Sequence, residues 1–425
     1  MVHQNWARNL TYSARELVRP TSLEQLAEVL TGDEPVRALG SRHSFNDVAD
    51  THGVHVQVDA LDDGRPAVDP LTPDGESTGV VSVNAGLRYG EVSRGLHATG
   101  RGLGNLASLP HISIAGAVAT ATHGSGDANQ SLASSVVGLE LMTPNGELRR
   151  LTRDEHPDVF GGCVVSLGAL GVVTRVELLT VPTYAVRQDV AAHVPWDAFV
   201  SDFDAITGSA YSVSAFTSWD EPDVRHVWFK SLAGADGGNR PDVPASVRSW
   251  AGAPVHPLPG VDPAACTEQL GVAGPWNDRL SHFRLEFTPS AGDEIQSEYL
   301  FPRRKLGAAV EAMRAISATV GPLLQTSEIR TIAPDDLWLS PFDEPSVGFH
   351  FTWLSRPAEV LAVLPDVERA LMPLGARPHW GKVSTVDARD QAELYPRFAD
   401  FRQLADRLDP EGRLRGGLVG RLLAD

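Results

Sequence analysis

The sequence predicts a protein of mixed helices and strands with more than one domain, and three observations support this prediction. The chain has 425 residues, which is too long for one ordinary domain and leaves ample core to bury. Residues 1–180 alternate helix-like and strand-like segments between many glycines. After a change of character at residues 180–184, aromatic segments follow in which polar and apolar residues strictly alternate. We therefore place a domain boundary near residue 180.

Five segments of the first 180 residues have a regular pattern. Residues 22–30 show helical apolar spacing after a serine that can cap the helix. Residues 35–39 and 54–58 are short strands, the second with valines alternating with polar residues. Residues 136–151 form a hairpin around a Pro-Asn-Gly turn, and residues 167–179 lead from a glycine-punctuated helix end into a buried strand.

The later part of the chain predicts a long surface excursion, three strands and a helix. Residues 231–263 are rich in Gly, Pro, Asp and Ala, as surface loops are. Strict alternation predicts strands at residues 281–288, 327–331 and 348–353, because successive side chains of a strand point to opposite sides. Residues 306–320 have the spacing of an amphipathic helix.

One face of these three strands carries polar and charged side chains, which form either solvated surface or the wall of a polar pocket. The first strand places His282, Arg284 and Glu286 on this face. For any single strand, solvated surface is the more common outcome. Four polar residues of the other two strands lie within about 25 positions of one another, and this clustering makes the two outcomes more nearly equal: Glu328, Arg330, His350 and Thr352.

Charge and composition exclude several classes of partner. The chain carries 54 acidic and 36 basic residues, a formal net charge of −18, which argues against nucleic acid and anionic membranes. No run approaches the ~18 apolar residues of a membrane span, and the start lacks the pattern of a signal peptide. Cys163 and Cys266 match no CxxC spacing, so we expect no disulfide framework. We expect a monomeric protein of the cytoplasm.

Lysine is scarce, since only Lys230, Lys305 and Lys382 occur among the 36 basic residues. A GC-rich coding bias replaces lysine with arginine wherever either will serve. A lysine that persists is therefore a candidate for a role that needs lysine, although drift explains any single case equally well.

Two glycine-rich segments dominate the first domain. Residues 39–47, Leu-Gly-Ser-Arg-His-Ser-Phe-Asn-Asp, directly follow a predicted strand, and consecutive backbone N–H groups in such a turn can bind phosphate. Residues 106–126 contain a run of Ala, Gly, Ser and Thr with little bulk, so a flat ligand or a pyrophosphate could approach the backbone closely. For either segment alone, tight helix packing explains the composition equally well.

Other chemistries match the sequence poorly. Residues 102–104, Gly-Leu-Gly, lack the third glycine of a Rossmann fingerprint, and Val383 after Lys382 excludes a Walker A motif. Neither a zinc-binding HExxH pair nor a GxSxG nucleophile elbow occurs. We therefore expect no metal site and no hydrolase.

Five motifs together resemble a known flavoprotein superfamily. Residues 40–44, Gly-Ser-Arg-His-Ser, resemble the covalent-flavin loop of the vanillyl-alcohol oxidase superfamily, and residues 116–126 resemble its second FAD-binding stretch. Residues 379–382, His-Trp-Gly-Lys, are similar to the closing motif of the sugar-lactone and alditol oxidases. Residues 328–330 and 350–352 look like the substrate-side motifs of alditol oxidases. The order and spacing match over nearly the whole chain.

The resemblance implies an α+β architecture with a vanillyl-alcohol-oxidase-type FAD-binding fold and an inserted substrate (cap) domain built on an antiparallel sheet. The FAD-binding domain would comprise residues 1–180 and the substrate-binding domain residues 181–375. Residues 376–425 would return to the FAD domain, which explains how the closing motif reaches the flavin.

The resemblance also implies FAD bound covalently through the ring of His43 to the flavin 8α-methyl group; a histidine that only packs near the flavin is the alternative. Gly40, Ser41, Arg42 and Ser44 would contact the pyrophosphate. The remaining cofactor contacts would come from later segments: Ser108, Ser113, Gly116, Thr120, His123, Gly171, Val173 and His379.

The implied reaction is oxidation of the terminal primary hydroxyl of a polyol, such as xylitol or sorbitol, to the aldose, with hydride transfer to flavin N5 and reduction of O2 to H2O2. Arg330 and Lys382 would be catalytic, because cations stabilise a developing alkoxide and a desolvated lysine can act as a base. Both would also bind substrate, together with Ser108, Glu328, His350 and Thr352.

Three alternatives remain open from the sequence. An aldonolactone (gulono-, galactono- or arabinono-1,4-lactone) oxidase or dehydrogenase would share the fold and the motifs. A flavoprotein without turnover would keep the cofactor for a structural purpose. Finally, Glu328 and Arg330 could form only a surface ion pair, worth under about 1 kcal/mol.

Overall fold

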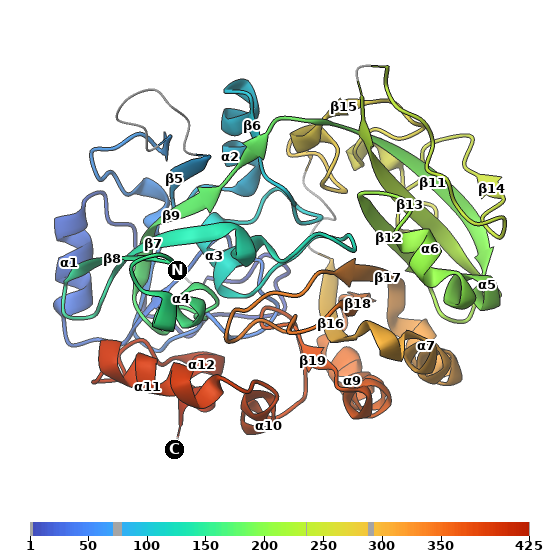
Figure 1. The fold of residues 1–425 in the computed structure, drawn as a ribbon. Coiled ribbons are helices and arrows are strands. Elements are labelled where there is room, and N and C mark those ends of the chain that lie inside the picture. Colours follow the sequence, from blue (N-terminus) through green and yellow to red (C-terminus); the bar gives the residue numbers. More distant parts are fainter. Residues whose placement is uncertain (1–2, 71–78, 235, 288–292, 425) are drawn as a thin grey trace.

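Two large sheets organise the molecule in a computed structural model, which describes residues 3–70, 79–234, 236–287 and 293–424. A five-stranded sheet is built by the N-terminal part of the chain, and a nine-stranded sheet is built by the middle part and residues beyond it. Figure 1 shows the two sheets side by side, with the C-terminal helices beneath the first. Within the described ranges, no helix is long and apolar enough to cross a membrane.

The five-stranded sheet is antiparallel throughout. Its strands are, in spatial order, β4 (Val68–Asp69), β5 (Val80–Asn84), β9 (Val172–Leu179), β7 (Val136–Met142) and β8 (Leu148–Thr152). Parallel pairing joins three further strands in the order β1 (Glu16–Val18), β3 (Val54–Val56) and β2 (Val36–Ala38). Strands β6 (Arg101–Gly102) and β10 (Val181–Pro182) pair with each other. The helices of this part are α1 (Leu23–Thr31), α2 (Tyr89–Ala98), α3 (Ile114–Ala119) and α4 (Pro157–Val164).

The nine-stranded sheet is also antiparallel. Its main path runs through β14 (Ser249–Trp250), β11 (Ala185–Pro195), β13 (Asp223–Ala233), β12 (Ser212–Thr217), β17 (Leu324–Ile332), β18 (Ser346–Leu354), β16 (Glu294–Pro302) and β19 (Arg377–Pro378). Strand β15 (Gly274–Pro275) pairs with β11 outside this path.

One face of this sheet is apolar and lies under helices. Phe349, Phe351 and Trp353 alternate along β18 and are fully buried in a core that includes α7 (Leu306–Ala315) and α9 (Pro357–Leu371). The burial of these aromatic side chains is a large stabilising contribution to the fold. The helices of this layer are α5 (Trp196–Ser201), α6 (Phe203–Thr207), α7 (Leu306–Ala315), α8 (Ser317–Val320) and α9 (Pro357–Leu371) (Figure 1).

The C-terminal helices pack on the N-terminal part of the molecule, as Figure 1 shows for α11 below α4. Apolar side chains of these helices share one core with Leu26 and Leu30 of α1. Arg37 of β2 donates a hydrogen bond to the Leu414 carbonyl at 2.8 Å. The helices concerned are α10 (Ala388–Glu393), α11 (Phe398–Leu408) and α12 (Gly417–Leu423).

Most of the predicted elements are confirmed. Helix α1 begins where the sequence predicts it, since the Ser22 side chain accepts a hydrogen bond from the Gln25 amide. The hairpin is β7 and β8, and the predicted strands in the later sheet are β17 and β18. The helix predicted at residues 306–320 is divided into α7 and α8.

The strand predicted at residues 281–288 is wrong. Within residues 281–287 the structure contains one isolated bridge, between Cys266 and Phe283, and Thr288 lies outside the described residues. The amides of His282 and Phe283 both donate to the carbonyl of Ser108, at 3.0 and 3.3 Å. These amides are therefore not available to a neighbouring strand. The alternation of polar and apolar residues in this part of the sequence is not caused by strand pairing.

Candidate active site

A cavity of about 580 Å³ lies between the glycine-rich loops and the polar face of β16, β17 and β18. Its walls contain every residue that the sequence predicts for the site: Gly40, Ser41, Arg42, His43, Ser44, Ser108, Ser113, Gly116, Thr120, His123, Gly171, Val173, Glu328, Arg330, His350, Thr352, His379 and Lys382. The polar face of the sheet is thus a pocket wall and not solvated surface.

The two glycine-rich loops are joined to each other at Ser41 and Ser113. The Ser113 amide donates to Ser41 Oγ at 3.0 Å, and the Ser41 amide donates to Ser113 Oγ at 3.3 Å. A Cβ atom at Gly40 would lie 2.4 Å from Ser113 Oγ, and one at Gly116 would lie 2.8 Å from it. Glycine is therefore needed at position 40 for the first loop to approach the second, and at position 116 for Ser113 Oγ to keep its place within the second loop.

His43 lies on the wall that the first loop forms. Its Nδ1 is 3.0 Å from Ser41 Oγ, and its ring stacks on Trp6 with 5.2 Å between the ring centroids. Burial, and then the nearby His111, lower the pKa of His43 to about 4. The imidazole is therefore neutral near pH 7, and a neutral imidazole retains one nitrogen lone pair that can act as a nucleophile.

Asn46 connects the first loop to the closing motif. Its Nδ2 donates to the carbonyls of Trp380 and Lys382, each at 2.9 Å. The Phe45 amide donates to the Gly381 carbonyl at 2.8 Å. These three bonds fix the turn that carries Lys382 beside the loop that carries His43.

Four charged side chains form a buried network at the centre of the cavity. Glu298 of β16 accepts from Arg330 Nη2 at 2.5 Å and from Lys382 Nζ at 2.7 Å. Arg330 Nε lies 3.7 Å from Oε1 of Glu328. Glu328 and Arg330 each expose only 6% of their side chains, so the hypothesis of a surface ion pair is wrong.

The network contains two basic and two acidic side chains, whose charges shift one another's pKa values. Burial alone would raise the pKa of Glu298, but the charges of Arg330 and Lys382 outweigh it and hold that pKa well below its usual range. Burial lowers the pKa of Lys382; Glu298 opposes this shift and Arg330 adds to it. Lys382 therefore releases its proton more readily than a lysine in water.

Further polar groups extend the network along the sheet. His282 Nε2 lies 2.9 Å from Oε1 of Glu328. Arg330 Nη1 donates to Ser108 Oγ at 3.4 Å. On the next strand, His350 Nε2 lies 3.0 Å from Gln296 Oε1. The pocket wall therefore presents donors and acceptors over several residues of β16, β17 and β18.

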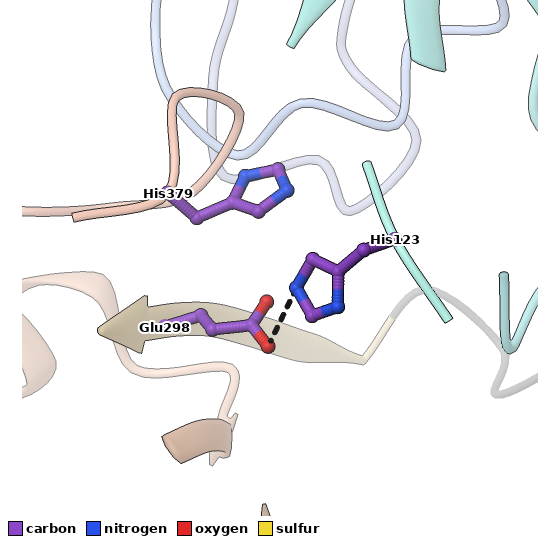
Figure 2. A group of neighbouring side chains, drawn as sticks. All are labelled: His123, Glu298 and His379. Atoms are coloured by element: carbon purple, nitrogen blue, oxygen red, sulfur yellow. Dashed lines mark ion pairs between the residues drawn. The ribbon is translucent and has the colours of Figure 1, made fainter. Parts of the chain in front are cut away.

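His123, Glu298 and His379 have the composition of a metal-binding group, and their ligand atoms lie within 4.8 Å of one another. Figure 2 shows the two imidazole rings beside the Glu298 carboxylate, with His123 Nε2 at 3.3 Å from Oε1. Both carboxylate oxygens already accept from Arg330 and Lys382, and these two positive charges oppose a third cation. We therefore assign no metal to this group.

Sequence reasoning missed Glu298 and Gln296, and it placed His282 on the polar face without assigning it to the site. A signal for the first two was present, since β16 alternates acidic or amide residues with Ile295, Ser297 and Tyr299. Residues 256–258 were also missed, because they lie in the segment predicted as a surface excursion and yet line the cavity.

Comparison with known proteins adds the family. Residues 14–152 match the FAD binding domain family, and residues 293–422 match the D-arabinono-1,4-lactone oxidase family. An alditol oxidase from Streptomyces sp. (strain IKD472 / FERM P-14339) is 44% identical over 99% of this chain and 98% of its own length. The chain belongs to the alditol oxidase family.

Proteins named as lactone oxidases or dehydrogenases are less similar to this chain in sequence. L-gulono-1,4-lactone dehydrogenase of Mycobacterium tuberculosis (strain ATCC 25618 / H37Rv) is 28% identical over 96% of each chain. L-gulonolactone oxidase of Bos taurus is 25% identical over 96% of this chain and 95% of its own. The coarse fold prediction is confirmed: an FAD binding domain is combined with helices and antiparallel sheets.

Four buried histidines of the site predict how stability depends on pH. Burial is the main cause that lowers the pKa of His123, His282, His350 and His379. As pH falls through about 6.5, the unfolded chain binds protons that the folded protein does not bind. The free energy of unfolding should therefore decrease below about pH 6.5, by up to about 1.4 kcal/mol per pH unit for each histidine. Urea denaturation at pH values from about 7.5 to about 5 measures the free energy of unfolding. A free energy of unfolding that stays constant over this range would contradict the prediction.

Proposed function

We propose that this protein is an FAD-dependent alditol oxidase, which oxidises the terminal primary hydroxyl of a polyol such as xylitol or sorbitol to the aldose and reduces O2 to H2O2. The buried arrangement of Arg330 and Lys382 on Glu298, inside a cavity that also contains the glycine-rich loops, is the observation that carries this proposal. The name of the 44% identical relative supports it.

The residues of the cavity suit FAD. The joined loops at Ser41 and Ser113 present backbone with little side-chain bulk, and Gly40 and Gly116 admit the close approach. When bound, FAD supplies the oxidant, which accepts a hydride from the alcohol carbon and passes the electrons to O2. We place the covalent bond at His43, whose neutral ring lines the same cavity.

Side chains around the cavity can stabilise the negative charge that develops on the substrate oxygen and can accept the proton of the substrate hydroxyl. Arg330 provides a fixed positive charge beside the substrate oxygen, where it stabilises alkoxide character. Burial lowers the pKa of Lys382, so its neutral amine can accept the hydroxyl proton at Nζ. Glu298 Oε2, 2.7 Å away, then stabilises the ammonium that forms.

Polyol recognition needs hydrogen-bonding groups along the whole substrate, since each carbon carries a hydroxyl. Glu328 provides carboxylate acceptors, and Ser108, His350 and Thr352 provide further polar groups on the same cavity. Neighbouring same-face positions of a strand are about 7 Å apart, which is comparable to the length of a three-carbon unit plus its hydroxyls.

We also propose the domain organisation implied by the sequence, with an FAD-binding domain at residues 1–180 and a substrate domain at residues 181–375. Residues 376–425 would belong to the FAD-binding domain. The shared core of the C-terminal helices and α1 supports this division.

The competing function is an aldonolactone oxidase or dehydrogenase, and the match of residues 293–422 to a lactone oxidase family favours it. Steady-state assays of H2O2 release with xylitol, sorbitol, L-gulono-1,4-lactone and L-galactono-1,4-lactone distinguish the two. We expect kcat/KM to be more than about tenfold higher for a polyol, a difference of about 1.4 kcal/mol in transition-state stabilisation. Preference for a lactone would overturn the proposed function.

Replacing His43 by alanine should make the flavin extractable, because the ring nitrogen that we propose to bond to the flavin is removed. Acid precipitation of the unsubstituted protein should give a yellow pellet. The His43→Ala pellet should be white under a yellow supernatant. Replacement of the solvent-exposed His52, which lies outside the cavity lining, is the matched control and should keep the pellet yellow. A white pellet from the unsubstituted protein would rule out the covalent bond.

A further inference from the structure

Lys230 of β13 is a buried lysine outside the network described above. It is 1% exposed, and its Nζ donates to the carbonyls of Arg279, Leu280 and Ser281 at 2.7, 2.6 and 2.8 Å. Three carbonyls on one short segment therefore receive the three hydrogens of a single ammonium group. The segment itself, residues 279–283, overlaps the beginning of residues 281–288, for which the sequence wrongly predicts a strand.

The geometry explains why lysine occupies this position in a chain that otherwise uses arginine. A buried charge is unfavourable unless its hydrogen bonds are satisfied. An ammonium group directs three donors outward from one atom, whereas a guanidinium spreads its donors over a rigid planar fork. Three consecutive carbonyls that converge on one point fit the first and not the second. The geometry of this site therefore suits lysine better than arginine.

The segment that Lys230 holds contacts the substrate side of the cavity at three places. Ser281 Oγ donates to the Ala107 carbonyl at 2.9 Å. The amides of His282 and Phe283 donate to the Ser108 carbonyl at 3.0 and 3.3 Å. The His282 ring lies 2.9 Å from Glu328. Ser108 and Glu328 are both residues that we propose to bind the polyol.

We propose that Lys230 is a positioning residue for the substrate: its ammonium group fixes residues 279–281, and these hold His282 on Glu328 and the backbone of Ser108 in place. The functional part of this inference rests on the proposed function. Lys230 does not itself line the cavity, so it acts through His282 and Ser108. Arg330 and Lys382 keep their ion pairs with Glu298 in the absence of Lys230, although Arg330 also contacts Ser108.

The test compares Lys230→Met with Lys305→Met, which removes an exposed lysine and is the matched control. Burial lowers the pKa of Lys230 to about 7, with Glu328 opposing this shift, so assays at about pH 6 keep the ammonium protonated. We expect Lys230→Met to raise KM for xylitol about 10- to 100-fold and to change kcat by less than about threefold, because recognition is lost and the catalytic cations remain. Lys305→Met should change neither.

A second measurement does not depend on turnover. Hydrogen exchange at the amides of His282 and Phe283 should become at least about tenfold faster in Lys230→Met, because their segment is released. Exchange at the β17 amides of Glu328 and Ile329 should stay the same. A double-mutant cycle with His282→Asn should be non-additive in KM, since both changes act through the same contact.

The outcomes separate the hypotheses. Unchanged exchange at His282 and Phe283 overturns the proposal, and so does a loss of kcat and thermal stability without a change in KM, which indicates a purely structural lysine. If Lys230→Met does not fold, Lys230→Gln, which keeps two N–H donors, is measured instead and should show the same pattern at smaller magnitude. If the unsubstituted protein oxidises no polyol, the proposed function fails, and the exchange measurement still decides the positioning by Lys230.

Discussion

Replacing Lys382 by methionine should lower kcat for polyol oxidation by about 10²- to 10³-fold, a loss of about 3–4 kcal/mol of transition-state stabilisation. Methionine has a similar length and removes both the charge and the group that accepts the hydroxyl proton. Glu298 keeps its contact with Arg330, at 2.5 Å, so the fold of the cavity should be retained. The measurement is single-turnover bleaching of the flavin absorbance by xylitol, which isolates the oxidation of the alcohol from the reaction with O2.

Two further variants show which property of Lys382 accounts for the loss of rate. Lys382→Arg keeps a positive charge but cannot release its proton near neutral pH, so it should restore substrate binding and not the rate. Lys305→Met should leave the rate unchanged. A Lys382→Met protein that oxidises xylitol within about tenfold of the unsubstituted rate would show that this lysine is dispensable for the chemistry.

Removing the charge of Glu298 should have the largest effect on stability. Glu298→Gln leaves Arg330 and Lys382 buried without the carboxylate that both of them contact, at 2.5 and 2.7 Å. Breaking a buried ion pair by removing one partner typically costs about 3–5 kcal/mol, because the remaining charge is uncompensated. Urea denaturation at about pH 7 should show a decrease of this size in the free energy of unfolding.

An exposed ion pair provides the matched control. Glu359 of α9 lies 3.5 Å from Arg356, and the side chains are 58% and 56% exposed. Glu359→Gln should change the free energy of unfolding by less than about 1 kcal/mol. Equal effects of the two substitutions would show that the network around Glu298 contributes no more to stability than a solvated pair.

The residues of the candidate site could be predicted from the sequence where local motifs carry them. The loop with His43 and the turn with Lys382 are short contiguous segments, and the polar side of β17 and β18 is visible from alternation. Alternation along β16 also marks Glu298 as polar, but its role could not be predicted, because that role comes from two cations that lie 32 and 84 residues away along the chain. The pairing of β12 with β17, at Ala215 and Ile329, is equally non-local.

The strand wrongly predicted at residues 281–288 and the hydrogen bonds of Lys230 concern the same segment of the chain. His282 lies on Glu328, and the amides of His282 and Phe283 donate to Ser108. His282 and Phe283 both line the cavity, whereas Glu286 and Phe287 are both exposed, so these side chains do not alternate between two faces as in a strand. What holds this conformation is Lys230, about 50 residues earlier in the chain. The alternation in this segment therefore identifies neither the direction of the side chains nor the partners of the backbone.

The hydrogen bonds from Asn46 to the closing motif have a consequence for when the candidate active site can be assembled during synthesis. Asn46 and the Lys382 carbonyl are 336 residues apart, so this contact closes only after almost the entire chain has left the ribosome. The loop that would carry the flavin is synthesised early, and Lys382, which we propose as the base, is synthesised late. A nascent or truncated chain can thus contain the flavin loop without this lysine, and under the proposed function it would not yet generate peroxide.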